Sequence, residues 1–356
     1  MTLHIFNPEH DLALAASDGN FTAPHAGRQL RADLGYIPLL WAKQGDLVLV
    51  NDKDWAWQAY SKLKVEHRKD VHLVTAEELP QAFEERPKLT VSPWGWDPAL
   101  REQLRRAGVP ENSLPDRHQV DQIRDLSNRR LAVTILDRLK DLEGTTGFSR
   151  VCNTYEELLV FLDANEHIAV KAPWSSSGRG VRYMDRETAV ENVNMLQWIC
   201  NTIKRQGSVT AELYCNKVQD FAVEFMATRK EVKAVGLSLF ETQKSAYTGN
   251  VLAPEDKKLK MLTQLLPHAQ IEAAVSRLET LLYDHIGGIY EGPLGVDMMV
   301  VKNTAPTGQP YLLNPCVEIN LRCTMGHVAL ALSKAGLQGA MHIEYNGQNY
   351  KLKLTL

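Results

Sequence analysis

The sequence lacks any pair of cysteines spaced for metal binding or redox exchange. Its 356 residues include five cysteines, none in a C-x-x-C arrangement, which is typical of reduced thiols in a cytoplasmic protein. No apolar run approaches the roughly 20 residues of a membrane-spanning helix. The first residues, MTLHIFNPEHDLALAAS, lack the basic start and unbroken apolar run of a signal peptide. We therefore expect a cytoplasmic protein without a membrane anchor.

An excess of charge of one sign is also missing. The chain has 40 lysines and arginines against 43 aspartates and glutamates, a formal net charge of −3. No overall field therefore attracts nucleic acid or an anionic membrane, and any anion site must be built locally. Hydrophobic residues make up 44% of the chain, which is enough to fill several cores, and at roughly 150 residues per domain the length predicts two to three domains.

The first third of the chain alternates short apolar runs, at 3–6, 46–50, 71–75 and 89–92, with helix-like segments. This pattern predicts an α/β domain with a largely parallel sheet over residues 1–120. A helix is expected over 121–142, followed by strands and helices up to residue 214. A long helical stretch over 256–285 should break near Pro267. We expect three domains, at 1–120, 121–212 and 213–356.

A lysine at the end of a predicted strand precedes a turn of serines and glycines. Lys171 supplies a charge, Ser175 to Ser177 supply hydroxyls, and Gly178 and Gly180 allow backbone N–H groups to converge on phosphate. The residues that follow read as a strand, whereas a Walker loop or a dinucleotide fingerprint must open a helix, and neither motif occurs. An ordinary glycine turn with a surface lysine is an equal alternative.

Two late β runs, at 295–301 and 311–322, read as an antiparallel hairpin. Side chains alternate faces along a strand, so Glu318, Asn320 and Arg322 should share one side. If Asp297 lies across from them, two carboxylates and an amide oxygen converge, a donor set that suits Mg²⁺. The alternative is a half-buried strand with a solvated outer face. Pro315 suggests an edge or a bulge in this strand and leaves the register of Asp297 open.

In this order, the lysine strand, the glycine loop and the late acidic strands resemble the ATP-grasp superfamily over roughly residues 120–330. The resemblance implies an α/β amino-terminal domain followed by two α+β subdomains that clamp the nucleotide: a small central one with the glycine-rich flap and a carboxy-terminal one with the metal site. It implies that Lys171 binds the α/β-phosphates and that Asp220 holds the ribose. It also implies a flap over the phosphates, formed by Ser176, Ser177, Gly178, Arg179 and Gly180. It implies that the hinge that meets the adenine consists of Glu212, Leu213 and Tyr214, and that the magnesium ligands are Asp297, Glu318 and Asn320.

Four further residues correspond to positions of the superfamily. Arg129 and Arg130 stand where many members have a phosphate-binding lysine, and either can neutralise phosphate. Arg322 matches an arginine that steadies the transferred phosphate or the acceptor. Lys244 stands where several members place a γ-phosphate lysine, and a solvated loop charge is an equal alternative.

The resemblance implies an enzyme, an ATP- and Mg²⁺-dependent ligase that joins a small-molecule carboxylate to an amine through an acyl phosphate. The alternatives are an ATP-grasp kinase acting on a small-molecule hydroxyl and a nucleotide-binding protein without turnover. Homodimers are common among the relatives. In the first domain, ligands should gather after the first and fourth strands, in the loops at 7–11 and 92–97. The alternative, which is the commoner one for any single histidine, is that His10 or His25 is a hydrogen-bonded structural side chain and that Trp94 and Trp96 close a core.

Overall fold

The computed structural model describes residues 1–63, 65, 70–175, 180–187, 192–243, 246–305 and 308–356. Its contacts divide the chain into two compact units. Unit 1 comprises Met1–Asp125, Thr248–Glu255 and Leu321–Leu356, and unit 2 comprises Leu126–Tyr247 and Asp256–Asn320. The last 36 residues therefore group with the amino-terminal segment, which the sequence did not indicate. The proposed three-domain division stays a prediction.

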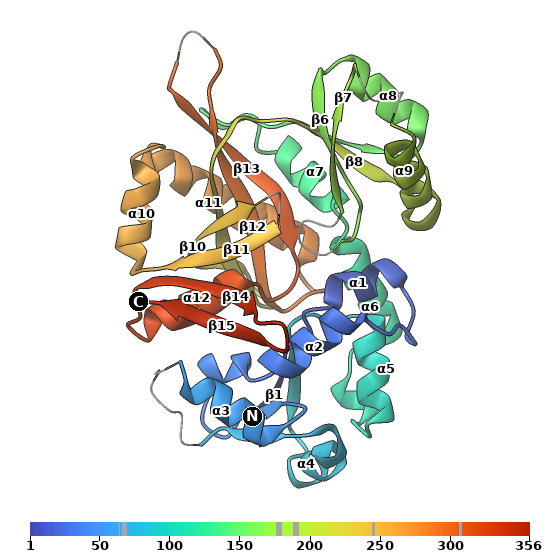
Figure 1. Ribbon diagram of the computed structural model, residues 1–356, viewed down its shortest axis with the longest axis vertical. Helices are drawn as coiled ribbons and strands as arrows, with labels where there is room; N and C mark the ends of the chain where they lie inside the picture. The colour runs from blue at the N-terminus through green and yellow to red at the C-terminus, as the bar shows by residue number, and fades with distance from the viewer. Residues whose placement is uncertain (64, 66–69, 176–179, 188–191, 244–245, 306–307) are drawn as a thin grey trace. The chain divides into compact units, whose positions relative to one another are not determined.

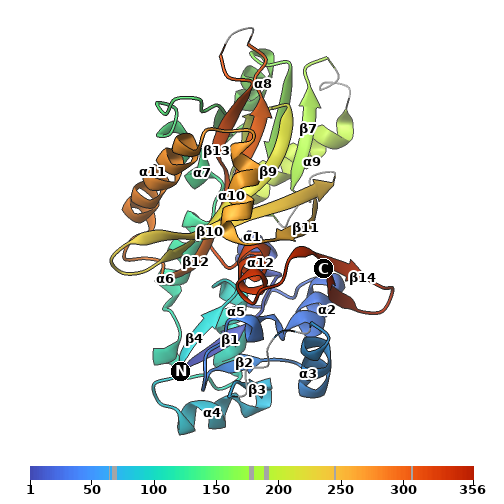
Figure 2. The same cartoon turned by 90° about the vertical axis from the view of Figure 1, so that its left-hand side faces the viewer.

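Unit 1 is built on a parallel sheet, as the apolar runs predicted. Its strands are β1 (Thr2–Ile5), β2 (Leu47–Leu49), β3 (His72–Val74) and β4 (Thr90–Pro93), in the order β3-β2-β1-β4 (Figure 2). The helices of the amino-terminal segment are α1 (His10–Ala16), α2 (His25–Leu34), α3 (Lys53–Ser61), α4 (Leu79–Glu85), α5 (Pro98–Arg106) and α6 (Arg117–Leu126), with short 3-10 turns at Ile37–Leu40, Ala76–Glu78 and Glu111–Ser113. The carboxyl ends of four parallel strands thus lie at one edge of this sheet.

The carboxy-terminal segment completes the core of unit 1. It forms α12 (Met325–Lys334) and the antiparallel pair β14 (Gly339–Tyr345) and β15 (Tyr350–Thr355), and β14 also pairs with β11 (Ala246–Leu252). Buried side chains of this segment, among them Val328, Leu332 and Met341, belong to one cluster with Phe6 and Leu34. Because these apolar groups exclude water together, the two ends of the chain stabilise a single core.

Unit 2 contains two groups of strands (Figure 1). The first is an antiparallel sheet of β5 (Ser149–Cys152), β8 (Val209–Leu213), β6 (His167–Lys171) and β7 (Val181–Asp185), in that order. It packs against α8 (Tyr155–Asp163) and α9 (Val193–Gln206), which bury Leu158, Phe161 and Ile199 against the strands. This group carries the lysine strand and the ends of the serine-glycine loop.

The second group in unit 2 carries the acidic strands. β13 (Tyr311–Asn320), β12 (Gly292–Lys302), β9 (Lys217–Ala227) and β10 (Val232–Gln243) follow one another as antiparallel neighbours. The remaining helices of unit 2 are α7 (Arg130–Asp137), α10 (Glu255–Thr263), whose first residue lies in unit 1, and α11 (His268–Ile286). The expected break near Pro267 is confirmed, since this residue precedes α11.

The single helix expected over 121–142 is wrong, because α6 ends at Leu126 and α7 begins at Arg130. Between them, the Asn128 side chain accepts a hydrogen bond from the Arg130 N–H at 2.9 Å, and the Arg129 N–H donates to the Pro173 carbonyl at 3.2 Å. An asparagine that bonds its own backbone competes with the helix ladder. The break leaves Arg129 at the start of α7.

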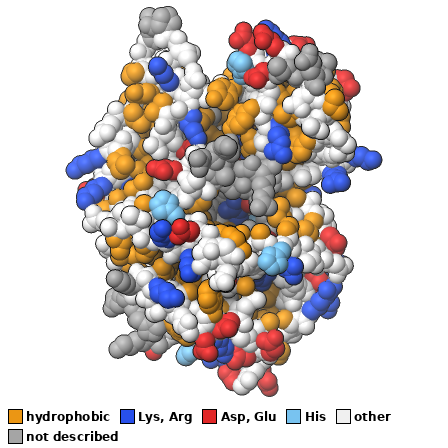
Figure 3. All heavy atoms as spheres, in the orientation of Figure 1, with side chains coloured by type: hydrophobic (Ala, Val, Ile, Leu, Met, Phe, Trp, Pro, Cys, Tyr) orange, Lys and Arg blue, Asp and Glu red, His pale blue; other side chains and the backbone are white. Residues whose placement is uncertain are grey.

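Two sequence expectations concern the surface and the thiols. On the face drawn in Figure 3, basic and acidic side chains are interspersed, in keeping with the nearly balanced charge. All five cysteines are free, and three of them, Cys152, Cys316 and Cys323, are buried. Among the described residues, no helix combines the length and the apolar character needed to span a bilayer.

Candidate functional site

Lys171, the first expected phosphate ligand, lies at the end of β6 and is only 7% exposed. Its Nζ is 2.5 Å from the Glu212 Oε2 of the neighbouring strand β8. The two side chains meet because Ala169 and Lys171 lie opposite Glu212 and Thr210, and cross-strand partners share a face. A buried ammonium needs such a partner. The pair places a cation and the first residue of the expected adenine hinge side by side.

The serine-glycine loop closes on a tight base. The Ala172 N–H donates to the Gly180 carbonyl at 2.9 Å, and a methyl group on Gly180 would lie 2.2 Å from the Ser175 side chain. Only glycine therefore fits at position 180 without displacing Ser175. Ser176, Ser177, Gly178 and Arg179 lie outside the described residues, so their role as a flap stays a prediction.

Arg129 connects the loop with the acidic strands. Its Nε donates to the Ala172 carbonyl at 2.9 Å, and its Nη2 donates to the Ser175 Oγ at 3.2 Å. Its Nη1 lies 2.7 Å from the Glu318 Oε2, and the residue is 8% exposed. One buried guanidinium thus contacts both the entrance of the loop and a predicted metal ligand. Arg130, the other candidate, is exposed.

The hairpin of β12 and β13 has the register that a shared oxygen site requires. Asp297 lies opposite Glu318, and Gly295 lies opposite Asn320, so the three polar side chains project from one face. Beyond Asp297 the register shifts, with Met299 opposite Asn314. The irregularity falls where Pro315 predicted a bulge, because proline cannot donate to the ladder.

The Cys316 thiol is influenced by charged residues from both halves of the expected site, the lysine sheet and the acidic strands. Burial raises the pKa of this thiol far above its ordinary value, the charges of Glu212 and Asp297 raise it further, and Lys171 opposes them. A thiolate here would stand among carboxylates in an apolar interior, so the thiol stays protonated. Glu212 from the lysine sheet and Asp297 from the acidic strands therefore act on the same atom.

The expected ribose ligand, Asp220, lies on β9 opposite Met299. Its Oδ2 is 2.5 Å from the Lys217 Nζ and accepts a hydrogen bond from the Thr242 Oγ1 at 2.7 Å. In the hinge, the N–H groups of Leu213 and Tyr214 donate to backbone carbonyls at 3.1 and 3.2 Å, and Tyr214 is 56% exposed. The ribose and adenine roles stay predictions, and Lys244 lies outside the described residues.

The donor set expected for a metal, which stays a prediction, consists of two carboxylates and one amide. No group of three or more His, Cys, Asp and Glu side chains in the described part of the chain is placed to hold a metal ion. Asp297, Glu318 and Asn320 offer oxygen atoms only, which fits Mg²⁺, since that ion usually keeps waters and completes its shell with substrate phosphates. Softer metals would need His or Cys.

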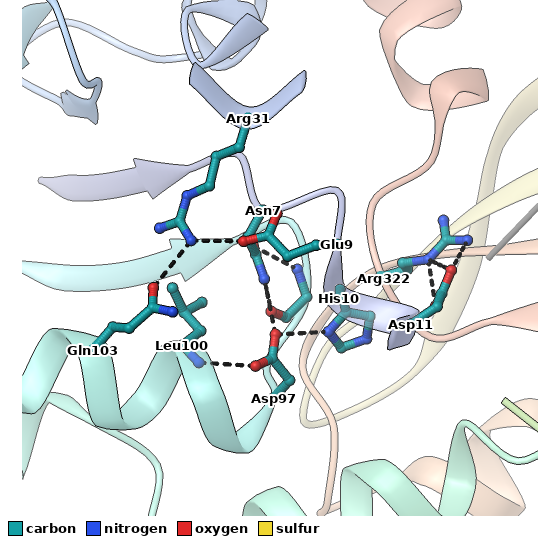
Figure 4. Close-up of polar contacts among 10 residues, drawn as sticks. Asn7, Glu9, His10, Asp11, Arg31, Asp97, Leu100, Gln103 and Arg322 are labelled. Atoms are coloured by element: carbon teal, nitrogen blue, oxygen red, sulfur yellow. Dashed lines mark hydrogen bonds and ion pairs between the residues drawn. The ribbon is translucent and has the colours of Figure 1, made fainter. Parts of the chain in front are cut away.

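Arg322 does not share the face of Glu318 and Asn320, because β13 ends at Asn320. It belongs to unit 1, where its Nε and Nη2 donate to the Asp11 carboxylate at 3.0 and 2.8 Å (Figure 4). The expectation that it continues the strand is therefore wrong. Its expected role with the transferred phosphate stays a prediction.

The loops after β1 and β4 in unit 1 are tied together. The Asn7 amide donates to the Gly95 carbonyl at 2.8 Å and to the Asp97 Oδ2 at 3.1 Å (Figure 4). His10 is 1% exposed, and its Nδ1 lies 3.4 Å from the same oxygen. Trp94 packs edge-on against Phe6, with ring centroids 4.9 Å apart. These contacts fit the structural alternative for His10 and Trp94, and a functional role for either residue stays untested.

One acidic residue on the face of Asp220 and Asp297 was not among the predicted site residues. Glu224 on β9 lies opposite Gly295 and is 1% exposed. It shares a face with Asp220 and Asp297, since the pairing of β9 with β12 is regular between them. The alternation of Asp220, Ala222 and Glu224 along one strand was the available signal.

Comparison with known proteins gives evidence of fold. No family model and no curated protein matches the sequence. Among solved structures, the biotin carboxylase–β-γ-ATP complex from Campylobacter jejuni matches with a TM-score of 0.50 and 14% identity over 99% of this chain and 73% of that chain. N5-carboxyaminoimidazole synthetase from Staphylococcus aureus, complexed with ADP, matches with a TM-score of 0.49 and 13% identity, covering 98% and 83%. The match to the biotin carboxylase shows that the chain has the ATP-grasp fold that its sequence resemblance implied.

Proposed function

We propose that the protein is an ATP- and Mg²⁺-dependent ligase that joins a carboxylate to an amine through an acyl phosphate. The observation that carries the proposal is the position of Arg129, whose guanidinium contacts Ser175 at the entrance of the serine-glycine loop and Glu318 on the acidic strand. Lys171 lies one residue before Ala172, the third partner of the same guanidinium. A triphosphate would find two cations and a hard-metal donor set within one part of unit 2.

The proposed roles follow from these contacts. Lys171 and Arg129 neutralise phosphate oxygens, and Asp297, Glu318 and Asn320 hold Mg²⁺, which would supply charge neutralisation on the phosphates. In the proposed bound state, Arg129 exchanges part of its contact with Glu318 for phosphate. Phosphoryl transfer needs little more from a protein than such neutralisation and in-line positioning.

The proposed reaction has two steps. A substrate carboxylate oxygen attacks the γ-phosphorus of ATP, and the bond between this phosphorus and the β,γ-bridging oxygen breaks. ADP departs, and the substrate has become an acyl phosphate. The amine then attacks the acyl carbon, phosphate departs, and the nitrogen loses a proton to give the amide. Support for this class comes from the fold shared with a biotin carboxylase bound to a nucleotide analogue. Exclusion of water protects the acyl phosphate from hydrolysis.

We expect Lys171→Ala to abolish Mg²⁺-dependent ADP release while the circular dichroism spectrum stays that of the parent. The assay supplies pooled amino acids and small carboxylic acids, with mass analysis of the product. Lys233→Ala is the matched control, because this exposed lysine of unit 2 pairs with Glu279 on the protein surface. Full activity of Lys171→Ala would remove that residue from the site.

The same assay separates the rival functions. A kinase would give a phosphorylated product and no free phosphate. A nucleotide-binding protein without turnover would be stabilised against heat by MgATP and would form no ADP with any acceptor mixture. Either result would contradict the ligase proposal.

A further inference from the structure

Unit 1 contains a cavity at the carboxyl edge of its parallel sheet. Its volume is about 400 Å³, and residues at or just after the ends of all four strands line it, including Phe6, Val50, Thr75 and Asp97. Open α/β sheets bind ligands at this edge. The volume is at the small end of the range for ligand sites, roughly 300–1,000 Å³, and suits a molecule of amino-acid size.

Apolar and polar side chains line the cavity in similar numbers, and Glu9 and Arg28 are among the polar ones. Phe6, Ala13, Phe21, Leu49 and Leu100 form apolar wall. Several polar neighbours are already engaged. The Asp97 Oδ1 accepts from the Leu100 N–H at 2.8 Å, its Oδ2 faces Asn7 and His10, and the Thr75 hydroxyl bonds Glu78. These engaged groups shape the cavity without offering free hydrogen-bonding capacity.

Glu9 offers an acceptor. Its side chain is 10% exposed, and its Oε1 accepts from the Arg31 Nη1 at 2.7 Å (Figure 4). The second oxygen, Oε2, is buried and has no hydrogen-bond partner among the described residues. A buried carboxylate oxygen left without a donor costs free energy. A ligand ammonium group is the donor that would best satisfy it.

Arg28 offers a donor. It lies in the first turn of α2, is exposed on the cavity wall, and its guanidinium makes no hydrogen bond or ion pair with the described residues. The helix begins after Pro24 with no side-chain cap, so its positive end is not compensated by a side chain there. A carboxylate or another anion would be attracted to both.

We propose that this cavity binds a small zwitterion, an amino acid or a close analogue, with its ammonium at Glu9 and its anionic group at Arg28. The assignment of this molecule as one of the two ligase substrates rests on the proposed function. The binding site itself does not, because it is built from unit 1 alone.

Titration calorimetry and saturation-transfer NMR on the full chain without nucleotide test the proposal. The probes are the common amino acids, one at a time, each with its amide, which lacks the carboxylate, and its N-acetyl derivative, which lacks the charged amine. We expect at least one amino acid to bind, and each derivative of it to bind roughly ten- to a hundredfold more weakly. Absence of binding for every amino acid, or equal binding of the derivatives, overturns the proposal.

Two charge-removing variants locate the site. Glu9→Gln should weaken the binding of the amino acid and leave the binding of its N-acetyl derivative unchanged. Arg28→Gln should weaken the binding of the amino acid and leave the binding of its amide unchanged. Glu85→Gln and Arg86→Gln are the matched controls, because these residues pair with each other at the end of α4, outside the cavity lining. Amino-acid binding that is unchanged in both site variants, or weakened equally in the controls, contradicts the assignment.

The outcome is independent of the ligase test. Amino-acid binding without nucleotide in a protein that forms no ADP would retain the cavity assignment and remove the ligase. ADP release with acceptors that do not bind this cavity would retain the ligase and remove the cavity assignment.

Discussion

At the scale of single residues, the structure distinguishes two adjacent arginines that the sequence left equivalent. Arg129 is 8% exposed and contacts Ala172, Ser175 and Glu318, whereas the neighbouring Arg130 is exposed. At the helix start the Arg129 N–H bonds the Pro173 carbonyl, and the Arg129 guanidinium contacts its three partners. The planar guanidinium presents its donors in a fixed fork, whereas a lysine ammonium is a compact point charge on a flexible stem.

We therefore expect Arg129→Gln to weaken the binding of MgATP roughly ten- to a hundredfold, since charge-assisted hydrogen bonds contribute about 1.5–3 kcal/mol each. Nucleotide affinity measured by calorimetry checks this. Arg130→Gln serves as the control and should bind as the parent does. If both variants bind equally well, Arg129 is not a phosphate ligand.

At the scale of elements, the sequence predicted strands better than helix ends. The four parallel strands, the lysine strand and the late hairpin were all predicted, because short apolar runs and period-two alternation mark strands directly. The register of Asp297 against Glu318 could not be predicted, since it depends on how a bulge at Pro315 is accommodated. The break between α6 and α7 was missed because it depends on a contact with Pro173, which is remote in the sequence.

The site was predicted to a similar extent. The sequence indicated Lys171 because it ends a strand, and it indicated Glu318 because Glu318 alternates with Asn320 along a strand, while Asp297 came from the neighbouring β run. The Lys171–Glu212 and Arg129–Glu318 pairs could not be predicted, since such ion pairs follow from register and burial. Arg28 and Glu9 form no motif, and only the three-dimensional cavity relates them.

The loops after β1 and β4 give an element-scale prediction. A methyl group on Gly95 would lie 2.7 Å from three atoms of the His10 ring, and the ring is buried against Asp97 and cannot move freely. Gly95→Ala should therefore lower the free energy of unfolding by about 1–3 kcal/mol. Chemical denaturation monitored by tryptophan fluorescence measures it.

Gly19→Ala is the control for this change. Its added methyl group would lie 3.5 Å from its nearest neighbour, an ordinary contact, so the free energy of unfolding should change little. Equal stability of the two variants would show that His10 has more room than the structure indicates.

At the scale of the whole molecule, the two ends of the chain share one core. Val328, Leu332 and Met341 are buried with Phe6 and Leu34, and the segment Leu321–Leu356 belongs to unit 1. The carboxy-terminal segment therefore stabilises the core of the parallel sheet. The strands that carry Asp297 and Glu318, β12 and β13, lie in unit 2 together with β9, the neighbour of β12.

Removal of residues 321–356 should accordingly destabilise unit 1 and leave the stability of unit 2 unchanged. Hydrogen exchange with mass spectrometry should show faster exchange in β1 and β2, while β9 and β12 stay protected, because amide protection follows local packing. The full-length chain is the reference. Loss of protection in β9 and β12, with β1 and β2 unchanged, would assign the segment to the other unit.

The division of unit 1 into three separate stretches of sequence has a consequence for synthesis. The ribosome completes Met1–Asp125 early, but the apolar partners of that stretch in Leu321–Leu356 are made only after all of unit 2. Unit 2 has been translated completely by then, so it can fold before the core of unit 1 is complete. Until α12, β14 and β15 leave the ribosome, Phe6 and Leu34 lack the apolar side chains that cover them in the folded core. A nascent chain that stalls before this point would expose these apolar residues to chaperones.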